Sequence, residues 1–310
     1  MLEKSHHNLK PGIISVLQTP FDPTGDVDFG SLACLVEDAI GSGVDGFLAP
    51  AVASEVDYLT AAEREEIVRA IARSVNGRVP LVVGASSAEV RLCQRFAALA
   101  EEVGADAYLV AVPAGLYHQT AQVVPFFDQV ASASERPLLI QDLQWNGPGL
   151  ELETIAQLRA ALPTLIGLKI ETVPAGPKYT AVRHRFGADF FIAGGWAVPQ
   201  WIEALDRGID AMIPESAMVG VYAAILARYR RGRRDAALEL FRQLLPVLAY
   251  TNQELAVSIA FFKRLLVRRG VFQSERMRIP GPVWDDYNTR IATELVELYL
   301  DLQRQVDGHK

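Results

Sequence analysis

The sequence has few cysteines, few lysines and no excess of positive charge. Its 310 residues include two cysteines, Cys34 and Cys93, whose spacing fits neither a disulfide framework nor a zinc site. The formal net charge of -7 argues against nucleic-acid binding, which requires a basic face, and the basic cluster RYRRGRR (228–234) fits a solvated helix end better. No hydrophobic run approaches the roughly 18 residues of a membrane span, and the N-terminus has no apolar export segment. We therefore expect a cytoplasmic protein without a nucleic-acid or membrane partner.

The chain also lacks the phosphate-binding loops G-x-G-x-x-G and G-x-x-x-x-G-K-[ST]. What it has is a repeated pattern of glycine, a small or apolar residue, aspartate and a short apolar run. The copies are GVDGFLA (43–49), GADAYLV (104–110), GADFFIA (187–193) and GIDAMIP (208–214). Glycine suits the end of a helix, and an unbroken apolar run suits a strand buried on both faces. Each copy therefore predicts a helix end followed by a buried parallel strand.

Eight short apolar runs occur in all, and each is followed by a segment with helical periodicity. They are residues 12–17, 46–51, 81–85, 107–112, 137–142, 165–170, 190–195 and 211–214. Eight strand–helix units fit a (β/α)8 TIM barrel better than a doubly wound sheet, which usually has five or six strands. We therefore predict an α/β barrel domain at residues 1–230 and a C-terminal three-helix extension at residues 231–310.

One of the few lysines stands in an apolar run. Only six of the 30 basic residues are lysines, and Lys169 lies near the end of the sixth predicted strand. The C-terminal ends of barrel strands carry the active site. An ammonium group beside a packed interior is costly to desolvate, which favours either a carboxylate partner or a neutral, nucleophilic amine. Lys169 is therefore a candidate Schiff-base nucleophile, and the alternative is a structural lysine paired with Glu171 or another carboxylate.

The residues around Lys169 resemble a known family of class I aldolases. The sixth strand of the dihydrodipicolinate synthase/N-acetylneuraminate lyase family typically reads I-x-G-[IL]-K-[ED], and this chain reads IGLKIET (166–172). Two further family elements occur in the same order, TPF (19–21) and EVDYLTAAER (55–64). The resemblance covers nearly the whole chain. It implies a lyase or aldolase, often a homotetramer, that acts on pyruvate or a related 2-keto acid without a metal or organic cofactor.

The loop after the second strand departs from the family pattern. The family usually has G-[ST]-T-G-E, whose hydroxyls and amides hold the keto-acid carboxylate, and this chain has AVASE, ending at Glu55. The remaining candidates for substrate binding are the backbone amides of Val52 and Ala53, with Ser54 beside them. Thr19 and Glu55 are expected to orient this loop. Substrate recognition is therefore expected to differ from that of the family.

The family's proton relay is also missing. The tyrosine at the end of strand five is replaced by Gln141, which cannot transfer a proton as an acid. We predict that Asp142, the next residue, is the acid–base group; alternatively, it caps a helix or binds an arginine. Gln141, Gly194 and Met212, at three strand ends, are predicted to contact substrate. Dihydrodipicolinate synthesis itself is not expected.

Two classes of function remain open. The first is a Schiff-base lyase that acts through Lys169 on a 2-keto acid. A metal-dependent aldolase barrel is disfavoured, because no His/Asp/Glu cluster gathers at the predicted strand ends. The second is a non-catalytic barrel that binds a keto acid or a partner protein, having lost the family's carboxylate-binding hydroxyls and its proton-relay tyrosine. A homo-oligomer, dimer or tetramer, is expected in either case. Other acid–base candidates at strand ends are Glu55, Glu171 and Glu215, with Tyr117 and His118 in the loop after strand four.

Overall fold

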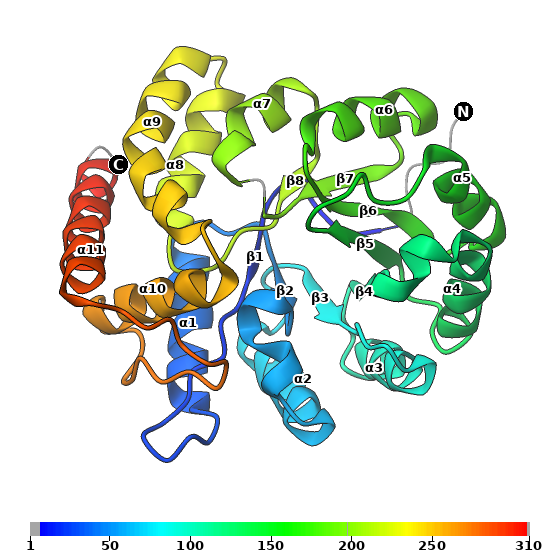
Figure 1. The fold of residues 1–310 in the computed structure, drawn as a ribbon, viewed down its shortest axis with the longest axis horizontal. Coiled ribbons are helices and arrows are strands. Elements are labelled where there is room, and N and C mark those ends of the chain that lie inside the picture. Colours follow the sequence, from blue (N-terminus) through cyan, green and yellow to red (C-terminus); the bar gives the residue numbers. More distant parts are fainter. Residues whose placement is uncertain (1–6, 197, 309–310) are drawn as a thin grey trace.

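Eight parallel strands form a closed barrel in the computed structural model, which describes residues 7–196 and 198–308 (Figure 1). The strands pair in the order of the sequence, and the last pairs with the first. They are β1 (Gly12–Val16), β2 (Gly46–Ala49), β3 (Leu81–Gly84), β4 (Ala107–Ala111), β5 (Leu138–Gln144), β6 (Leu165–Thr172), β7 (Phe191–Gly194) and β8 (Ala211–Met212). The predicted TIM barrel is confirmed. β5 and β6 continue two residues beyond their predicted ends, which matters for the site described below.

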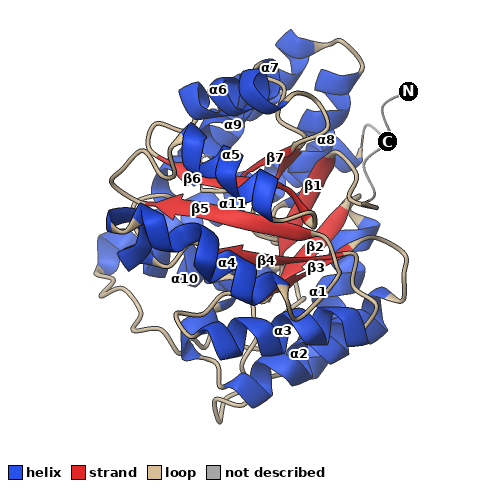
Figure 2. Cartoon of the chain, turned by 90° about the vertical axis from the view of Figure 1, so that its right-hand side faces the viewer, coloured by secondary structure: helices blue, strands red, loops and turns tan. Residues whose placement is uncertain are grey.

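Helices alternate with the strands and surround the barrel (Figure 2). They are α1 (Phe29–Gly41), α2 (Ala61–Val75), α3 (Val90–Glu102), α4 (Val123–Ala131), α5 (Leu152–Ala161), α6 (Gly176–Phe186), α7 (Trp201–Asp206) and α8 (Val219–Arg230). Short 3₁₀ turns lie in the βα loops: η1 (Val52–Ser54), η2 (Val56–Tyr58), η3 (Ala114–His118), η4 (Thr120–Gln122) and η5 (Val198–Gln200). α2 begins at a capping box, in which the Thr60 side chain accepts from the backbone of Glu63.

Three further helices follow the barrel: α9 (Arg234–Thr251), α10 (Leu255–Arg268) and α11 (Asp286–Asp307). They lie together on the side of the barrel away from α4 and α5 (Figure 1). α9 packs on α8, α11 packs on both, and α10 contacts the turn η1 at the barrel mouth. The extension therefore contributes to the wall of the site. Within the described residues, no helix is long and apolar enough to cross a membrane.

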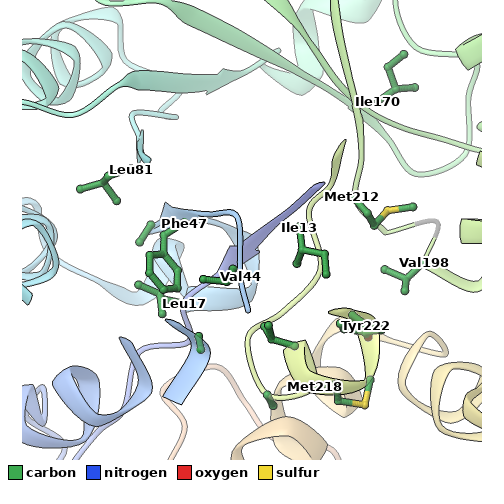
Figure 3. Packing of buried hydrophobic residues seen from close by; sticks show 14 of the residues in the cluster. Ile13, Leu17, Val44, Phe47, Leu81, Ile170, Val198, Met212, Met218 and Tyr222 are labelled. Atoms are coloured by element: carbon green, nitrogen blue, oxygen red, sulfur yellow. The ribbon is translucent and has the colours of Figure 1, made fainter. Parts of the chain in front are cut away.

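The strand side chains alternate between two apolar layers. Ile14 and Leu48 belong to the cluster inside the barrel. Ile13, Phe47 and Met212 belong to the larger cluster between the strands and the helices (Figure 3). Because successive side chains of a strand point to opposite faces, a shift of one residue decides whether a side chain faces the barrel interior or the helices.

Gly167 in β6 allows a close approach between two strands. A Cβ atom at this position would lie 2.0 Å from the carbonyl oxygen of Phe191 in β7. We predict that Gly167→Ala lowers the free energy of unfolding by about 1–3 kcal/mol, because the added methyl group forces the two strands apart. Urea unfolding measures this loss. Gly41→Ala, at the end of α1 with no neighbouring atom within 4 Å, is the control and should not destabilise the protein. Equal stability of the two variants would contradict the prediction.

Candidate active site

Lys169 and Glu171 lie on the same face of β6, two residues apart. The Lys169 Nζ is 3.2 Å from Glu171 Oε2, and both side chains are buried. Glu171 is still in the strand because β6 extends to Thr172. A Cβ atom at Gly195 would lie 2.0 Å from Glu171 Oε1 and 2.6 Å from Lys169 Cε. The pair therefore requires glycine immediately after β7.

Hydrogen bonds from two neighbouring segments hold Glu171 in place. The Gln141 Nε2 donates to Glu171 Oε2, and the Trp196 backbone N–H donates to Oε1 over 2.8 Å. The register of β5 and β6 places Gln141 directly opposite Lys169. Gln141 was predicted to contact substrate. In the structure its side-chain amide donates to Glu171 instead. It orients the carboxylate that lies beside the lysine.

A cavity opens beside this pair at the C-terminal end of the barrel. Both Lys169 and Glu171 line it. Trp145 and Trp196 form part of its wall and contact each other edge to face, with ring centroids 5.1 Å apart. Apolar side chains supply much of the remaining wall, among them Val16, Val52, Leu143, Ile213, Leu248 and Phe262. Charges in such surroundings are poorly screened by water.

The loop after β2 is held by its own side chains. The Ser54 hydroxyl accepts from the Ala51 N–H over 3.0 Å and donates to the Leu17 carbonyl over 2.6 Å. Thr19 donates to the Ser54 carbonyl over 2.8 Å, which agrees with its predicted orienting role. The Ser54 hydroxyl is thus engaged within the loop rather than offered to a substrate. Val52 and Ala53 do line the cavity. They are the first residues of the turn η1, where backbone N–H groups have no acceptor within the turn.

Glu55 joins this loop to the C-terminal extension. Its Oε1 lies 2.5 Å from the Nζ of Lys263 in α10, and its Oε2 accepts from the backbone N–H groups of Arg278 and Ile279. Lys263 also lies 4.3 Å from the ring centroid of Phe21, and burial lowers the pKa of this lysine to about 8. Glu55, which was predicted to orient the loop, therefore links the loop to the C-terminal extension. The ion-pair partner Lys263 was not predicted, although a lysine inside an otherwise apolar helical segment was visible in the sequence.

Asp142 lies in a different cluster. Its carboxylate accepts from the Tyr117 hydroxyl over 2.9 Å and from the Leu150 N–H over 3.0 Å, and lies 2.5 Å from Lys178 Nζ. The register pairs Asp142 with Ile170, on the face of the sheet opposite to Lys169. Asp142 is absent from the described residues that line the cavity. Its contacts fasten β5 to the following loop and to α6, and burial raises the pKa of Tyr117.

Two of the predicted substrate contacts are displaced by one residue. Met212 is fully buried in the outer cluster (Figure 3), and a Cβ atom at Gly194 would meet the Tyr179 hydroxyl and Met212 Sδ. Their successors, Gly195 and Ile213, line the cavity instead. The difference follows from the alternation of side chains, since an error of one residue exchanges the two faces of a strand. The described residues contain no group of three or more His, Cys, Asp or Glu arranged to hold a metal ion.

A buried lysine beside a carboxylate, at the end of β6 where barrel enzymes carry their active sites, is consistent with a class I lyase or aldolase. A family model confirms this class over most of the chain. Residues 10–297 match the Dihydrodipicolinate synthetase family, and the chain belongs to that family. The family resemblance predicted from the sequence is confirmed, and the protein is an enzyme of the lyase and aldolase type.

Similar proteins cover nearly the full length of the chain. L-2-keto-3-deoxyarabonate dehydratase of Azospirillum brasilense is 30% identical over 280 residues, 87% of this chain and 88% of the relative. 4-hydroxy-tetrahydrodipicolinate synthase of Bacillus subtilis strain 168 is 26% identical over 296 residues, 92% and 98% of the two chains. The solved structure of Ruminococcus gnavus sialic acid aldolase has a TM-score of 0.86 at 17% identity and covers 96% and 100%. The last comparison supports the fold alone.

Removing the buried lysine of the extension tests how the site loop is held. We predict that Lys263→Met lowers the free energy of unfolding by about 3–5 kcal/mol, because it leaves the Glu55 carboxylate buried without its ion-pair partner. Lys10→Met, at an exposed position, is the matched control and should change stability little. Urea unfolding of both variants measures the difference. A loss below about 0.5 kcal/mol for Lys263→Met would show that the pair does not hold the loop.

Proposed function

We propose that the protein is a lyase that forms a Schiff base between Lys169 and a 2-keto acid. The observation that carries this proposal is the buried contact between Lys169 Nζ and Glu171 Oε2, 3.2 Å long, in the wall of a largely apolar cavity. A lysine amine attacks a ketone only in its neutral form, and an adjacent carboxylate can accept the proton that must leave. The non-catalytic alternative gives no reason for placing this ion pair beside an open cavity.

Glu171 takes the acid–base role that the sequence assigned to Asp142. After Lys169 attacks the C2 carbonyl and water leaves, the iminium group acidifies the protons on C3. Glu171 then removes one of these protons to give the enamine, which is the electron source for making or breaking bonds further along the substrate. Gln141 and the Trp196 N–H hold the carboxylate in position for this transfer. Asp142 remains a structural residue bound to Lys178.

The proposed substrate is a 2-keto acid longer than pyruvate. The aliphatic and aromatic wall of the cavity offers apolar contact to carbons beyond the reacting keto-acid group. The backbone amides of Val52 and Ala53 are the proposed donors for the substrate carboxylate. The name of the Azospirillum relative, a dehydratase of a 2-keto-3-deoxy acid, supports this substrate class. We propose further that the enzyme works in the cytoplasm as a homo-oligomer.

Reductive trapping tests the nucleophile directly. With pyruvate or a longer 2-keto acid and borohydride, we expect a stable adduct on the peptide that contains Lys169, because reduction fixes the imine as an amine. Mass spectrometry of the digested protein locates the adduct, and Lys169→Ala should abolish it. Lys178, whose side chain is 11% exposed and paired with Asp142, is the internal control and should remain unmodified. Folded protein that gives no adduct with any of these acids would support the non-catalytic alternative.

A pair of isosteric substitutions separates the two carboxylates. We predict that Glu171→Gln slows the exchange of the C3 protons of pyruvate for deuterium by about 10²–10⁴-fold, because the base is lost. Asp142→Asn should keep the exchange rate within about fivefold and instead lower the free energy of unfolding, because Lys178 loses its buried partner. NMR in D₂O measures the exchange. Loss of exchange in Asp142→Asn with retention in Glu171→Gln would reverse the assignment.

A further inference from the structure

Glu215 is a second carboxyl group in the wall of the same cavity. It lies between β8 and α8, is 8% exposed, and lines the cavity together with Lys169 and Glu171. In the barrel order, β7 alone separates β6 from β8. Gly195, which follows β7 and also lines the cavity, has no side chain to stand between these groups. A substrate bound to Lys169 is thus within the same enclosed space as Glu215.

Hydrogen bonds to one of its two oxygens fix the orientation of this carboxyl group. Glu215 Oε2 accepts from Gln18 Nε2 over 3.3 Å and from the Ala217 N–H. Arg269, at the end of α10, donates to the Ala217 carbonyl over 2.7 Å and holds this turn. Among the described residues, Oε1 accepts no hydrogen bond of normal geometry, although the Tyr222 hydroxyl is close enough to favour the carboxylate. One oxygen is therefore engaged by two N–H donors, and the other is buried without a hydrogen-bond partner of normal geometry.

The surroundings of Glu215 stabilise its protonated form more than water stabilises that of an exposed glutamate. Burial raises the pKa of Glu215 to about 7, against the opposing effects of its hydrogen bonds and of Arg269. Since Oε2 already accepts two N–H donors, the proton of the neutral acid belongs on Oε1. The other titratable or charged groups around this carboxyl and its cavity are Lys169, Glu171, Tyr222, Arg269 and Tyr299.

We propose that Glu215 is the general acid that protonates a hydroxyl group as it leaves C4 of the substrate, which makes the reaction a dehydration. This inference rests on the proposed function, because the leaving step needs the enamine formed at Lys169. The enamine electrons form the C3=C4 bond as the C4–O bond breaks, and the iminium group is restored. The proton on Glu215 Oε1 joins the departing oxygen to give water. The proton that Glu171 took from C3 returns to Glu215 through solvent.

The substitution Glu215→Gln tests this role with little change of shape. Glutamine can accept the same hydrogen bonds from Gln18 and Ala217, but its amide cannot supply an acidic proton. With L-2-keto-3-deoxyarabonate and 4-hydroxy-2-ketopentanoate as probes, we expect the kcat for dehydration to fall by at least about 100-fold. Borohydride trapping of pyruvate on Lys169 should persist. Glu239→Gln, on the exposed face of α9, is the matched control and should match the wild type in both assays.

The pH dependence distinguishes an acid from a merely structural carboxyl group. The kcat of the wild type should fall as the pH rises through about 7, because the donor loses its proton, and the residual activity of Glu215→Gln should lack this decline.

The free energy of unfolding should show a matching dependence on pH. A carboxyl group whose pKa is higher in the folded than in the unfolded protein binds more protons when folded, so the stability of the wild type falls as the pH rises from about 4.5 to above 7. Glu215→Gln should show a weaker decline.

The outcomes separate this inference from the function on which it rests. A Glu215→Gln variant with the wild-type kcat and pH profile would overturn the role of Glu215. So would a wild-type protein that exchanges the C3 protons of pyruvate yet dehydrates neither probe. Both results would leave the Schiff-base mechanism intact. Absence of both trapping and exchange in the wild type would instead overturn the proposed function, and the role of Glu215 with it.

Discussion

The buried contact between Lys169 and Glu171 is the interaction on which the site depends. Two opposite charges removed from water are stable only when their attraction and further hydrogen bonds compensate the cost of desolvation. Here the barrel provides that compensation from three directions: the Gln141 amide from β5, the Trp196 N–H after β7, and the space left by Gly195. The pair also lines the cavity, which is why we propose it as the nucleophile and the base.

Lysine is rare in this chain, and three of its lysines lie largely out of water: the side chains of Lys169 and Lys263 are buried, and that of Lys178 is 11% exposed. Lys169, Lys178 and Lys263 are each paired with a single carboxylate, at 3.2, 2.5 and 2.5 Å. The last two pairs fasten elements together: one joins β5 to α6, and the other joins the loop after β2 to α10. Lys169 differs because its pair also faces a cavity. Two pairs therefore connect elements away from the cavity lining, and the third lies in that lining.

The sequence predicted the barrel, its eight strands and the position of Lys169, because those depend on apolar runs and helical periodicity, which are local properties. It ranked Asp142 above Glu171 because Asp142 directly follows Gln141, the replacement for the family's tyrosine, and the sequence did not specify which of these two residues faces the barrel interior. It chose Gly194 and Met212 over Gly195 and Ile213 for a related reason. Which face a strand residue occupies depends on register with its neighbours, and one sequence alone does not specify that register.

The most direct test of the central claim is a crystal structure of the protein after reduction with borohydride in the presence of pyruvate. The account predicts continuous density from Lys169 Nζ to C2 of the former pyruvate, with the Glu171 carboxylate within about 3.5 Å of C3. Density on another lysine, or an adduct on Lys169 from which Glu171 is turned away, would contradict the pairing of nucleophile and base proposed here.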